Sequence, residues 1–342
     1  MHIDDAIAAQ ADIHHQYFLG LQLMVAIEET RQTVFDWMFR LFRRQHEEKF
    51  LSSFEKLGLS HLPDAVACAK YHVLSNSMGG VAVEYMAESD TKSWVRFRYP
   101  RWMYAGPAIC GIPLEASRGF LHGWYAQNGV SLGNPRLGFV CVSEDVTGQF
   151  GLCGYFKEYD RDLCDDERLI FAPDERPPVF NAEDQPAPPA AEWSTERLAK
   201  ANRNYAMEYI RNGIRALSAV VGRERSETLG KKAARLIGLQ HYPFFANAIG
   251  FAEGGPEISA QFLKAAMSGM GDDCNVTEDA DGAFQVTQTG LRIARGQDGV
   301  ERNTLLSCWV ELWRGAINSQ REFLEVDAKI ETDRLIWTIK PE

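Results

Sequence analysis

The chain has 342 residues, of which 45% are hydrophobic and 24% are charged, and its formal net charge is −11. This composition is typical of a globular protein, and the length suits one large domain or two ordinary ones. The negative charge argues against a nucleic-acid partner, because binding to a phosphate backbone requires a basic surface.

The N-terminus, MHIDDAIAAQ, has no basic stretch followed by an apolar core, so it does not resemble a secretory signal. No apolar run approaches the roughly 20 residues that a membrane span needs. The seven cysteines are scattered and form no C-x-x-C pair, which suits reduced thiols. We therefore expect a cytoplasmic protein with no membrane partner.

The first half of the chain predicts helices followed by two strand hairpins. Apolar residues at helical spacing run through residues 4–52, with a break expected at Gly20. Further helices are predicted over 63–75 and 114–129. Alternating residues that include Val, Tyr, Trp and Phe predict a strand hairpin over 81–86 and 93–99. A second hairpin is predicted over 137–143 and 150–158, with Gly148 at its tip.

The segment 165–192 is acidic and rich in proline, as in DERPPVFNAEDQPAPP. This composition is typical of an extended linker with polyproline II character. Its apolar residues, such as Phe171 and Phe180, suggest that the linker lies along the surface of the protein and is anchored there.

The second half repeats the pattern of the first. Helices are predicted over 194–222, 224–238, 243–251, 256–268 and 303–317, and strands over 275–277, 284–294, 322–330 and 335–339. The sequence thus predicts an α+β fold with four parts. These are a helical N-terminal segment (1–62), a first α+β lobe (63–164), the linker (165–192), and helices with a second α+β lobe (193–342).

The two lobes look like an internal repeat. When Trp124 is placed over Trp309 without a gap, Leu121 falls on Leu306 and the order strand, strand, helix, strand, strand coincides. We expect two pseudo-repeated lobes, each an antiparallel sheet packed with helices, with a ligand pocket between them. The first copy carries more polar residues and is the better candidate for a functional site.

Three residues of the first lobe are candidate catalytic groups. His122 has a side chain suited to general base catalysis at neutral pH, and Glu84 is a carboxylate within an apolar strand. Glu158 ends a strand, where a carboxylate can face a cleft. The alternatives are a histidine satisfied within a helix–sheet interface and carboxylates that face solvent.

The candidate substrate-binding residues lie near these groups or on one later helix. They are His72, Asn76, Trp124, Asn128, Asp160, Tyr205 and Glu208. Tyr205 and Glu208 belong to a polar and aromatic stripe, RNYAMEY, for which inter-helix packing is an equal alternative. The sequence lacks H-E-x-x-H and paired C-x-x-C motifs, and it lacks nucleotide-binding glycine motifs, so we predict no metal and no cofactor.

The stretches SNSMGGVAVEYM, GWYAQNG and MGDDCNVTEDADGAFQV resemble, in layout, small-ligand domains of the 4-vinyl-reductase type and L-2-amino-thiazoline-4-carboxylate hydrolase-like proteins. The cysteine spacing departs from the vinyl-reductase pattern, so no metal site is carried over. The resemblance implies binding or hydrolysis of a small, polar, nitrogen-containing molecule.

We therefore expect a hydrolase that cleaves a C–N bond in such a molecule, using His122, Glu84 and Glu158. The first alternative is a non-catalytic binding or sensor protein for a small-molecule ligand. The second is a structural subunit whose N-terminal helices form a dimer face. A homo-oligomer is expected in either case.

Overall fold

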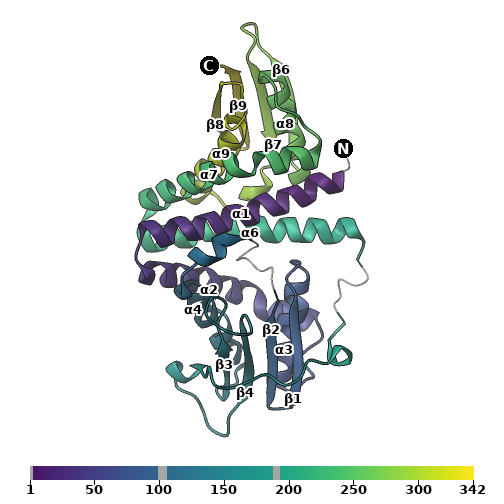
Figure 1. Cartoon of the computed structure of the whole chain (residues 1–342), viewed down its shortest axis with the longest axis vertical. Coiled ribbons are helices and arrows are strands. Elements are labelled where there is room, and N and C mark those ends of the chain that lie inside the picture. The colour runs from purple at the N-terminus through teal and green to yellow at the C-terminus, as the bar shows by residue number, and fades with distance from the viewer. Residues whose placement is uncertain (1–2, 99–105, 188–192) are drawn as a thin grey trace. The chain divides into compact units, whose positions relative to one another are not determined.

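The computed structural model describes residues 3–98, 106–187 and 193–342, and it confirms the α+β class. The chain divides into two compact units, each with one sheet and helices packed against it (Figure 1). The C-terminal unit combines Met1–Met24 with Thr195–Glu342. The central unit comprises Val25–Ser194.

Two long helices, α1 (Ile3–Glu28) and α2 (Arg31–Lys56), begin the chain. The break between them lies at Thr30, whose hydroxyl accepts a hydrogen bond from the Thr33 backbone and caps α2. The predicted break at Gly20 is therefore wrong. Gly20 lies inside α1, where a Cβ atom would stand 2.6 Å from Ile237 of the C-terminal unit, so the glycine serves close helix packing.

The sheet of the central unit contains both predicted hairpins. After α2, the helices and strands of this unit are α3 (Asp64–Ser77), β1 (Val83–Ser89), β2 (Lys92–Phe97), α4 (Leu114–Gly123), α5 (Asn128–Leu132), β3 (Leu137–Ser143), β4 (Cys153–Glu158) and β5 (Leu169–Phe171). Short 3-10 turns lie at Pro107–Gly111, Tyr125–Gln127, Asp165–Glu167 and Ala182–Asp184. The strand order is β1-β2-β4-β3-β5, and all pairs are antiparallel except β3 with β5. Residue 99, the predicted end of the second strand, lies outside the described residues.

The helix predicted over 114–129 is interrupted at Trp124. Helix α4 ends at Gly123, a 3-10 turn follows, and α5 starts at Asn128. This change of direction places Asn128 in the interior, where it is fully buried.

The two faces of the five-stranded sheet have different covers. Helix α3 packs on β1, β2 and β4. The other face carries an apolar cluster, against which Ala172 of the linker packs. The cluster consists of Met86, Trp94, Val140, Val142, Cys153 and Tyr155. The linker contains the short strand β5. It is also bonded to the sheet, because the Tyr155 hydroxyl donates to the Glu175 carboxylate of the linker at 2.8 Å. Residues 188–192 lie outside the described residues.

The linker also reaches β1, which is an edge strand of this sheet. The side-chain amide of Gln185 accepts from the Tyr85 backbone N–H at 2.9 Å and donates to the Tyr85 carbonyl at 2.7 Å. Gln185 therefore makes with its side chain both hydrogen bonds that a neighbouring strand would make with its backbone.

The sheet of the C-terminal unit has four antiparallel strands in the order β6-β7-β9-β8. From residue 195 on, the elements of this unit are α6 (Thr195–Val221), α7 (Arg223–Ile249), α8 (Pro256–Met270), β6 (Asp273–Glu278), β7 (Phe284–Thr289), a 3-10 turn (Arg292–Ala294), α9 (Gly299–Asn318), β8 (Leu324–Ile330) and β9 (Arg334–Pro341). The break predicted between residues 238 and 243 is wrong, because α7 continues through Pro243.

The repeat is visible in the topology of both units. The first four strands of one sheet and the four strands of the other have the same spatial order, and each central helix follows the first hairpin. The central helices differ in length, since α4 has 10 residues and α9 has 20. When Trp124 is placed on Trp309, α4, the 3-10 turn and α5 together fall on residues 299–317, within α9. The same placement puts β1 on residues 268–274, whereas β6 begins at Asp273, so the ungapped match does not extend to the first hairpin.

Glycines bring the central helix of each unit close to a neighbouring helix. A Cβ atom at Gly119 or Gly123 of α4 would stand 2.6 Å from the carbonyl oxygen of Phe35 or Phe39 of α2, respectively. In the other unit, a Cβ atom at Gly238 of α7 would stand 1.9 Å from the Leu312 oxygen of α9. Both helix pairs thus pack with their backbones nearly in contact.

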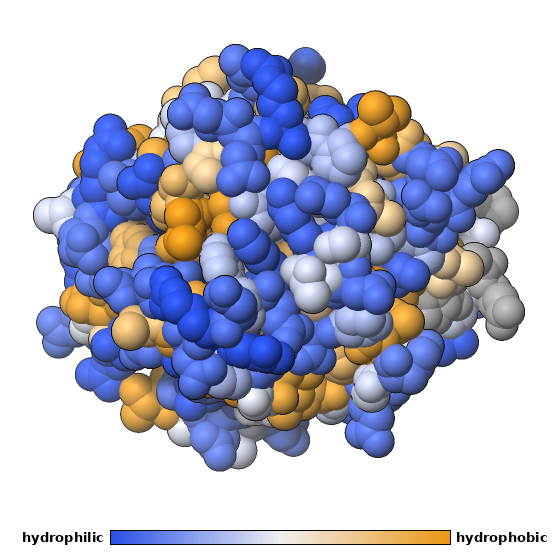
Figure 2. All heavy atoms as spheres, turned by 90° about the horizontal axis from the view of Figure 1, so that it is seen from below, coloured by the Kyte–Doolittle hydropathy of each residue, from blue (hydrophilic) through white to orange (hydrophobic). Residues whose placement is uncertain are grey.

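Among the described residues, no helix combines the length and the apolar character that crossing a membrane requires. On the face seen in Figure 2, hydrophilic residues predominate and hydrophobic residues gather in small, separate groups.

Candidate functional site

Three buried polar side chains meet in the interior of the central unit. His46 lies on α2, His72 on α3 and Asn128 at the start of α5, and each is at most 2% exposed. His46 Nε2 lies 3.1 Å from Asn128 Oδ1, and Asn128 Nδ2 lies 3.1 Å from His72 Nε2. We call these three residues the histidine centre.

The local sequence explains why these groups are inside. Phe42, His46 and Phe50 follow one another at intervals of four, so they share the buried stripe of α2. His72 lies on α3, where the residues on either side of it, Tyr71 and Val73, are buried too. The interruption at Trp124 turns Asn128 toward both histidines.

The hydrogen bonds of the histidine centre run in one direction. Arg43 Nη1 lies 3.2 Å from His46 Nδ1, and a guanidinium can only donate. His46 Nδ1 is therefore an acceptor, and its Nε2–H donates to the Asn128 oxygen. The Asn128 amide nitrogen then donates to His72 Nε2, which leaves the proton of His72 on Nδ1.

Both histidines are neutral at physiological pH. Burial, reinforced by the Arg43 guanidinium, lowers the pKa of His46 to about 4. Burial and the nearby His46 hold the pKa of His72 well below its usual value. A neutral centre of this kind is suited to hydrogen bonding and poorly suited to general base catalysis, because a base with so low a pKa drives proton transfer weakly.

The tautomers give the first testable prediction. In ¹⁵N-labelled protein, we expect the proton of His46 on Nε2 and that of His72 on Nδ1, with both rings still neutral at pH 5.5. Long-range ¹H–¹⁵N correlation spectra measure this directly, with the exposed His61 as the internal reference. A proton on Nδ1 of His46, or a charged His72 ring at pH 5.5, would contradict the directional chain.

Aromatic rings enclose the histidine centre. His46 stacks on Phe50 with ring centroids 4.6 Å apart, and His72 stacks on Tyr125 at 4.0 Å and on Phe156 at 5.5 Å. These rings keep the local dielectric constant low, which strengthens satisfied hydrogen bonds and makes unsatisfied ones costly.

One donor beside the centre has no acceptor. The ring of Trp124 stands perpendicular to that of His46, with centroids 5.5 Å apart. Its indole Nε1–H is buried and makes no hydrogen bond to any residue in the described part of the chain. A buried donor without an acceptor costs about 1–3 kcal/mol.

The structure thus brings together four of the predicted substrate-binding residues, namely His72, Asn76, Trp124 and Asn128. The Asn76 amide is occupied, because it donates to the His72 carbonyl at 2.7 Å. Sequence reasoning missed His46. A histidine within an apolar helical stripe is a signal of a buried polar group, but no spacing in the sequence links it to His72 or Asn128.

The predicted catalytic carboxylates lie apart from each other. Arg96 pairs across the sheet with both Glu84 on β1 and Cys153 on β4, so Glu84 lies beside the start of β4, whereas Glu158 ends that strand. Residues 153 and 158 are about 17 Å apart along the strand, and their odd separation puts the side chains on opposite faces.

Each of these carboxylates has a basic partner. Glu84 is 3.0 Å from Arg98 and 3.7 Å from Arg96, and Glu158 forms an ion pair with Arg136. These contacts hold the two carboxylates in separate ion pairs on the sheet.

His122 and Asp160 occupy two further places. His122 is half-buried on α4, with its ring 5.5 Å from that of Phe35, and burial followed by the nearby Arg118 lowers its pKa. Within the described chain, no hydrogen bond or ion pair connects His122 to Glu84 or Glu158. Asp160 is exposed just after β4.

Tyr205 and Glu208 lie on α6 and belong to the C-terminal unit. The Tyr209 hydroxyl donates to the Tyr205 hydroxyl at 2.7 Å, and the Asn212 amide donates to Glu208 at 3.4 Å. Both residues thus belong to a different unit from the histidine centre.

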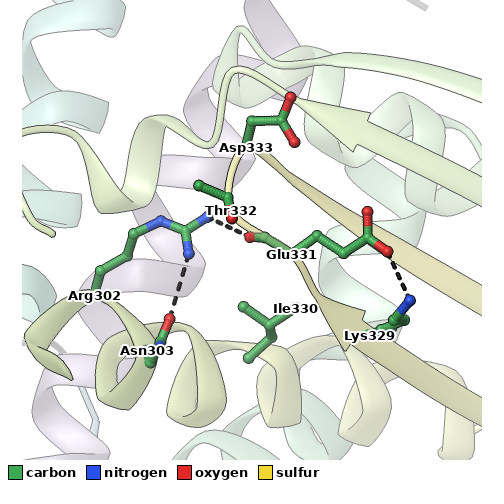
Figure 3. Close-up of a pocket in the computed structure, with 7 residues that line it drawn as sticks. All are labelled: Arg302, Asn303, Lys329, Ile330, Glu331, Thr332 and Asp333. Carbon is green, nitrogen blue, oxygen red and sulfur yellow. Dashed lines mark hydrogen bonds and ion pairs between the residues drawn. The ribbon is translucent and has the colours of Figure 1, made fainter. Parts of the chain in front are cut away.

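A surface hollow of about 440 Å³ lies between the start of α9 and the turn joining β8 to β9 (Figure 3). Two of its charged groups, Lys329 and Glu331, are paired with each other, and Arg302 bonds to backbone. Arg302 donates to the Glu331 carbonyl at 3.0 Å, and Lys329 is 2.7 Å from the Glu331 carboxylate. Nowhere in residues 3–98, 106–187 and 193–342 do three His, Cys, Asp or Glu side chains gather closely enough to hold a metal ion.

The chain matches no protein-family model, and no curated protein or solved structure is detectably similar to it.

Proposed function

We propose that this chain is a small-ligand-binding protein whose ligand is held at the histidine centre of the central unit. The observation that carries the proposal is the buried indole N–H of Trp124, which has no acceptor among the described residues and lies beside His46. A ligand with a hydrogen-bond acceptor would remove the cost of that unsatisfied donor.

The surroundings define the chemical class of the ligand. The histidine centre is neutral and enclosed by rings, so it favours an uncharged molecule over an ion, which would lose its hydration without gaining a counter-charge. An amide or a nitrogen heterocycle meets these conditions, and the resemblance of GWYAQNG implies a similar class.

Hydrolysis by His122, Glu84 and Glu158 stays a prediction, because it requires groups that the fold holds in separate contacts. Homo-oligomer formation and a cytoplasmic location likewise stay predictions. The binding function requires none of these three properties.

The test uses the Trp124 indole as its own probe. Acetamide, 2-pyrrolidinone, 2-pyridone and pyrimidine are each titrated into ¹⁵N-labelled protein. We expect at least one of them to shift the indole resonance of Trp124 and the ring resonances of His46 together, and to do so saturably. Trp124→Phe keeps an aromatic ring but removes the donor, and should weaken that binding about tenfold, the value of one hydrogen bond.

Trp313 supplies the matched control. Its indole Nε1–H is also buried and lacks an acceptor in the described chain, but it belongs to the C-terminal unit. Trp313→Phe should leave binding unchanged. If none of the four compounds shifts the Trp124 resonance, or if both variants lose binding equally, the histidine centre is a structural feature of the core.

A further inference from the structure

An arginine of the C-terminal unit, Arg292, has a side chain with no hydrogen-bonding partner in the described part of the chain. Arg292 begins the 3-10 turn that follows β7, and its side chain is half-buried. Its Nε–H is buried without an acceptor, and no hydrogen bond or ion pair joins its guanidinium to any residue that the structure describes. An arginine is seldom placed in this way, since each buried, unsatisfied donor is costly.

A second guanidinium lies close to the first. Arg203 of α6 is only 4% exposed and donates to the Gly269 carbonyl at 2.8 Å. Burial, followed by the charge of Arg292, lowers the pKa of Arg203 to about 10. Arg203 bonds to Gly269 and Arg292 lies beside Gly271, so the end of α8 and the glycine after it bring the two cations to the same place.

The nearby carboxylate of Asp272 does not neutralise this pair. One of its oxygens accepts from the Arg292 backbone N–H at 2.9 Å, and the other accepts from the Gln288 amide at 2.8 Å. Asp272 thus holds the turn in place, while two positive charges face one negative charge. Asp273 is exposed next to it, and Glu208 faces Arg211.

The backbone around Arg292 is fixed and locally strained. Leu291, immediately before it, has a φ of 29°, which is rare for a residue with a side chain. Arg211 donates to the carbonyls of Ile293 and Arg292, both at 3.0 Å. Gly271 has a φ of 87°, and a Cβ atom there would stand 3.1 Å from Arg292 Nε, so glycine leaves room for the guanidinium.

We propose that Arg292, with Arg203 beside it, forms a binding site for an oxyanion, either the carboxylate or the phosphate group of a small molecule. A guanidinium presents parallel N–H groups that match two oxygens of such an anion. The anion supplies the acceptor that Arg292 Nε lacks and balances the excess positive charge. This site is independent of the histidine centre, which takes a neutral ligand.

The experiment titrates the full chain separately with inorganic phosphate and with acetate, each at constant ionic strength set by sodium chloride. The side-chain Nε–H resonances of the arginines are followed by NMR, and the heat of binding by calorimetry. We expect saturable binding with a Kd on the order of 1 mM, with the Arg292 resonance shifting most. Phosphate binding without acetate binding identifies a phosphate site, and the reverse identifies a carboxylate site.

Variants at neighbouring arginines give the control. Arg292→Gln should bind at least tenfold more weakly, and Arg292→Lys, which keeps the charge but not the fork, should fall between. Arg295→Gln removes an exposed charge three residues away and should bind like the unmodified protein. Binding that is not saturable by 20 mM anion, or that is weakened equally by Arg292→Gln and Arg295→Gln, would overturn the proposal, because it would reflect general charge screening.

Discussion

Lowering the pH from 7.5 to 5 is expected to reduce the free energy of unfolding by several kcal/mol. The groups responsible are four buried histidines, His14, His15, His46 and His72. Burial lowers the pKa of the first three to about 4 and that of His72 well below its usual value. In the unfolded chain a histidine titrates near 6.5.

The free energy of unfolding falls with the pH because the unfolded chain takes up more protons than the folded chain. Above pH 6.5 all four rings are neutral in both states, so their contribution is fully present. As the pH falls toward 4, the unfolded chain binds protons that the folded chain cannot, and stability is lost at about 1.4 kcal/mol per pH unit for each proton. A histidine held at a pKa of about 4 thus costs about 3 kcal/mol to protonate in the fold.

His14 shows why the fold resists protonation. The Trp309 indole donates to His14 Nε2 at 3.0 Å, and an indole can only donate, so Nε2 must stay unprotonated. Nδ1 lies 2.7 Å from the Gln10 carbonyl, to which it donates. A second proton on this ring would face the Trp309 N–H.

Urea unfolding at pH 7.5, 6.5, 5.5 and 5.0, followed by circular dichroism, measures the effect. His61→Gln, at an exposed position, should leave the pH dependence unchanged. The buried carboxylate of Asp272 acts in the opposite direction, because burial raises its pKa, but it is outnumbered by the four histidines. Stability that stays constant or rises as the pH falls to 5 would show that the buried rings accept protons.

The second large effect is expected at Gly238. Replacing it with alanine adds a Cβ atom 1.9 Å from the Leu312 carbonyl oxygen, a backbone atom that cannot rotate away. Helices α7 and α9 must then separate, and overpacking of this kind costs about 1–3 kcal/mol or more. The gain of about 1 kcal/mol in helix propensity offsets only part of this. We expect a net loss of about 2 kcal/mol.

Gly20→Ala is the matched control, since it gives the same gain in helix propensity within α1. Its new Cβ atom meets only the side chain of Ile237, at 2.6 Å, and that side chain can change rotamer. Its free energy of unfolding should stay within about 1 kcal/mol of the unmodified protein. Equal stability of the two variants in urea unfolding would show that α7 and α9 adjust their spacing freely.

The same glycines show what sequence patterns reveal and what they hide. The short apolar run 137–143, which follows the turn residues of LGNP, predicts β3 to the residue, because a strand next to a turn has a local signature. The sequence predicts a helix break at Gly20 and a helix end at Gly238, whereas both glycines lie inside long helices. A glycine that permits contact with a distant helix looks the same in the sequence as one that ends a helix, because its reason is tertiary.

In the candidate site too, residues with a local sequence signal are predicted and residues that depend on distant contacts are not. Asn128 and Trp124 are found by sequence reasoning because they stand in a short segment dense in polar and aromatic residues. Strand β5 and His46 are not, because each depends on a partner remote in the chain: β5 pairs in parallel with β3, and His46 bonds to Asn128. Arg292 is not predicted either, because only the three-dimensional structure shows that its Nε–H lacks a hydrogen-bond acceptor among the described residues.

The amide of Gln185 has a consequence for how the protein meets other copies of itself. An open edge strand is a template on which a second chain can add by backbone pairing, which leads to aggregation. At Tyr85 that template is already occupied, and the occupant is a side chain within a segment whose prolines cannot extend a sheet. At Tyr85, the side chain of Gln185 thus blocks the pairing of β1 with a strand of another molecule. A further strand of this chain at the same place would instead have a new open edge of its own.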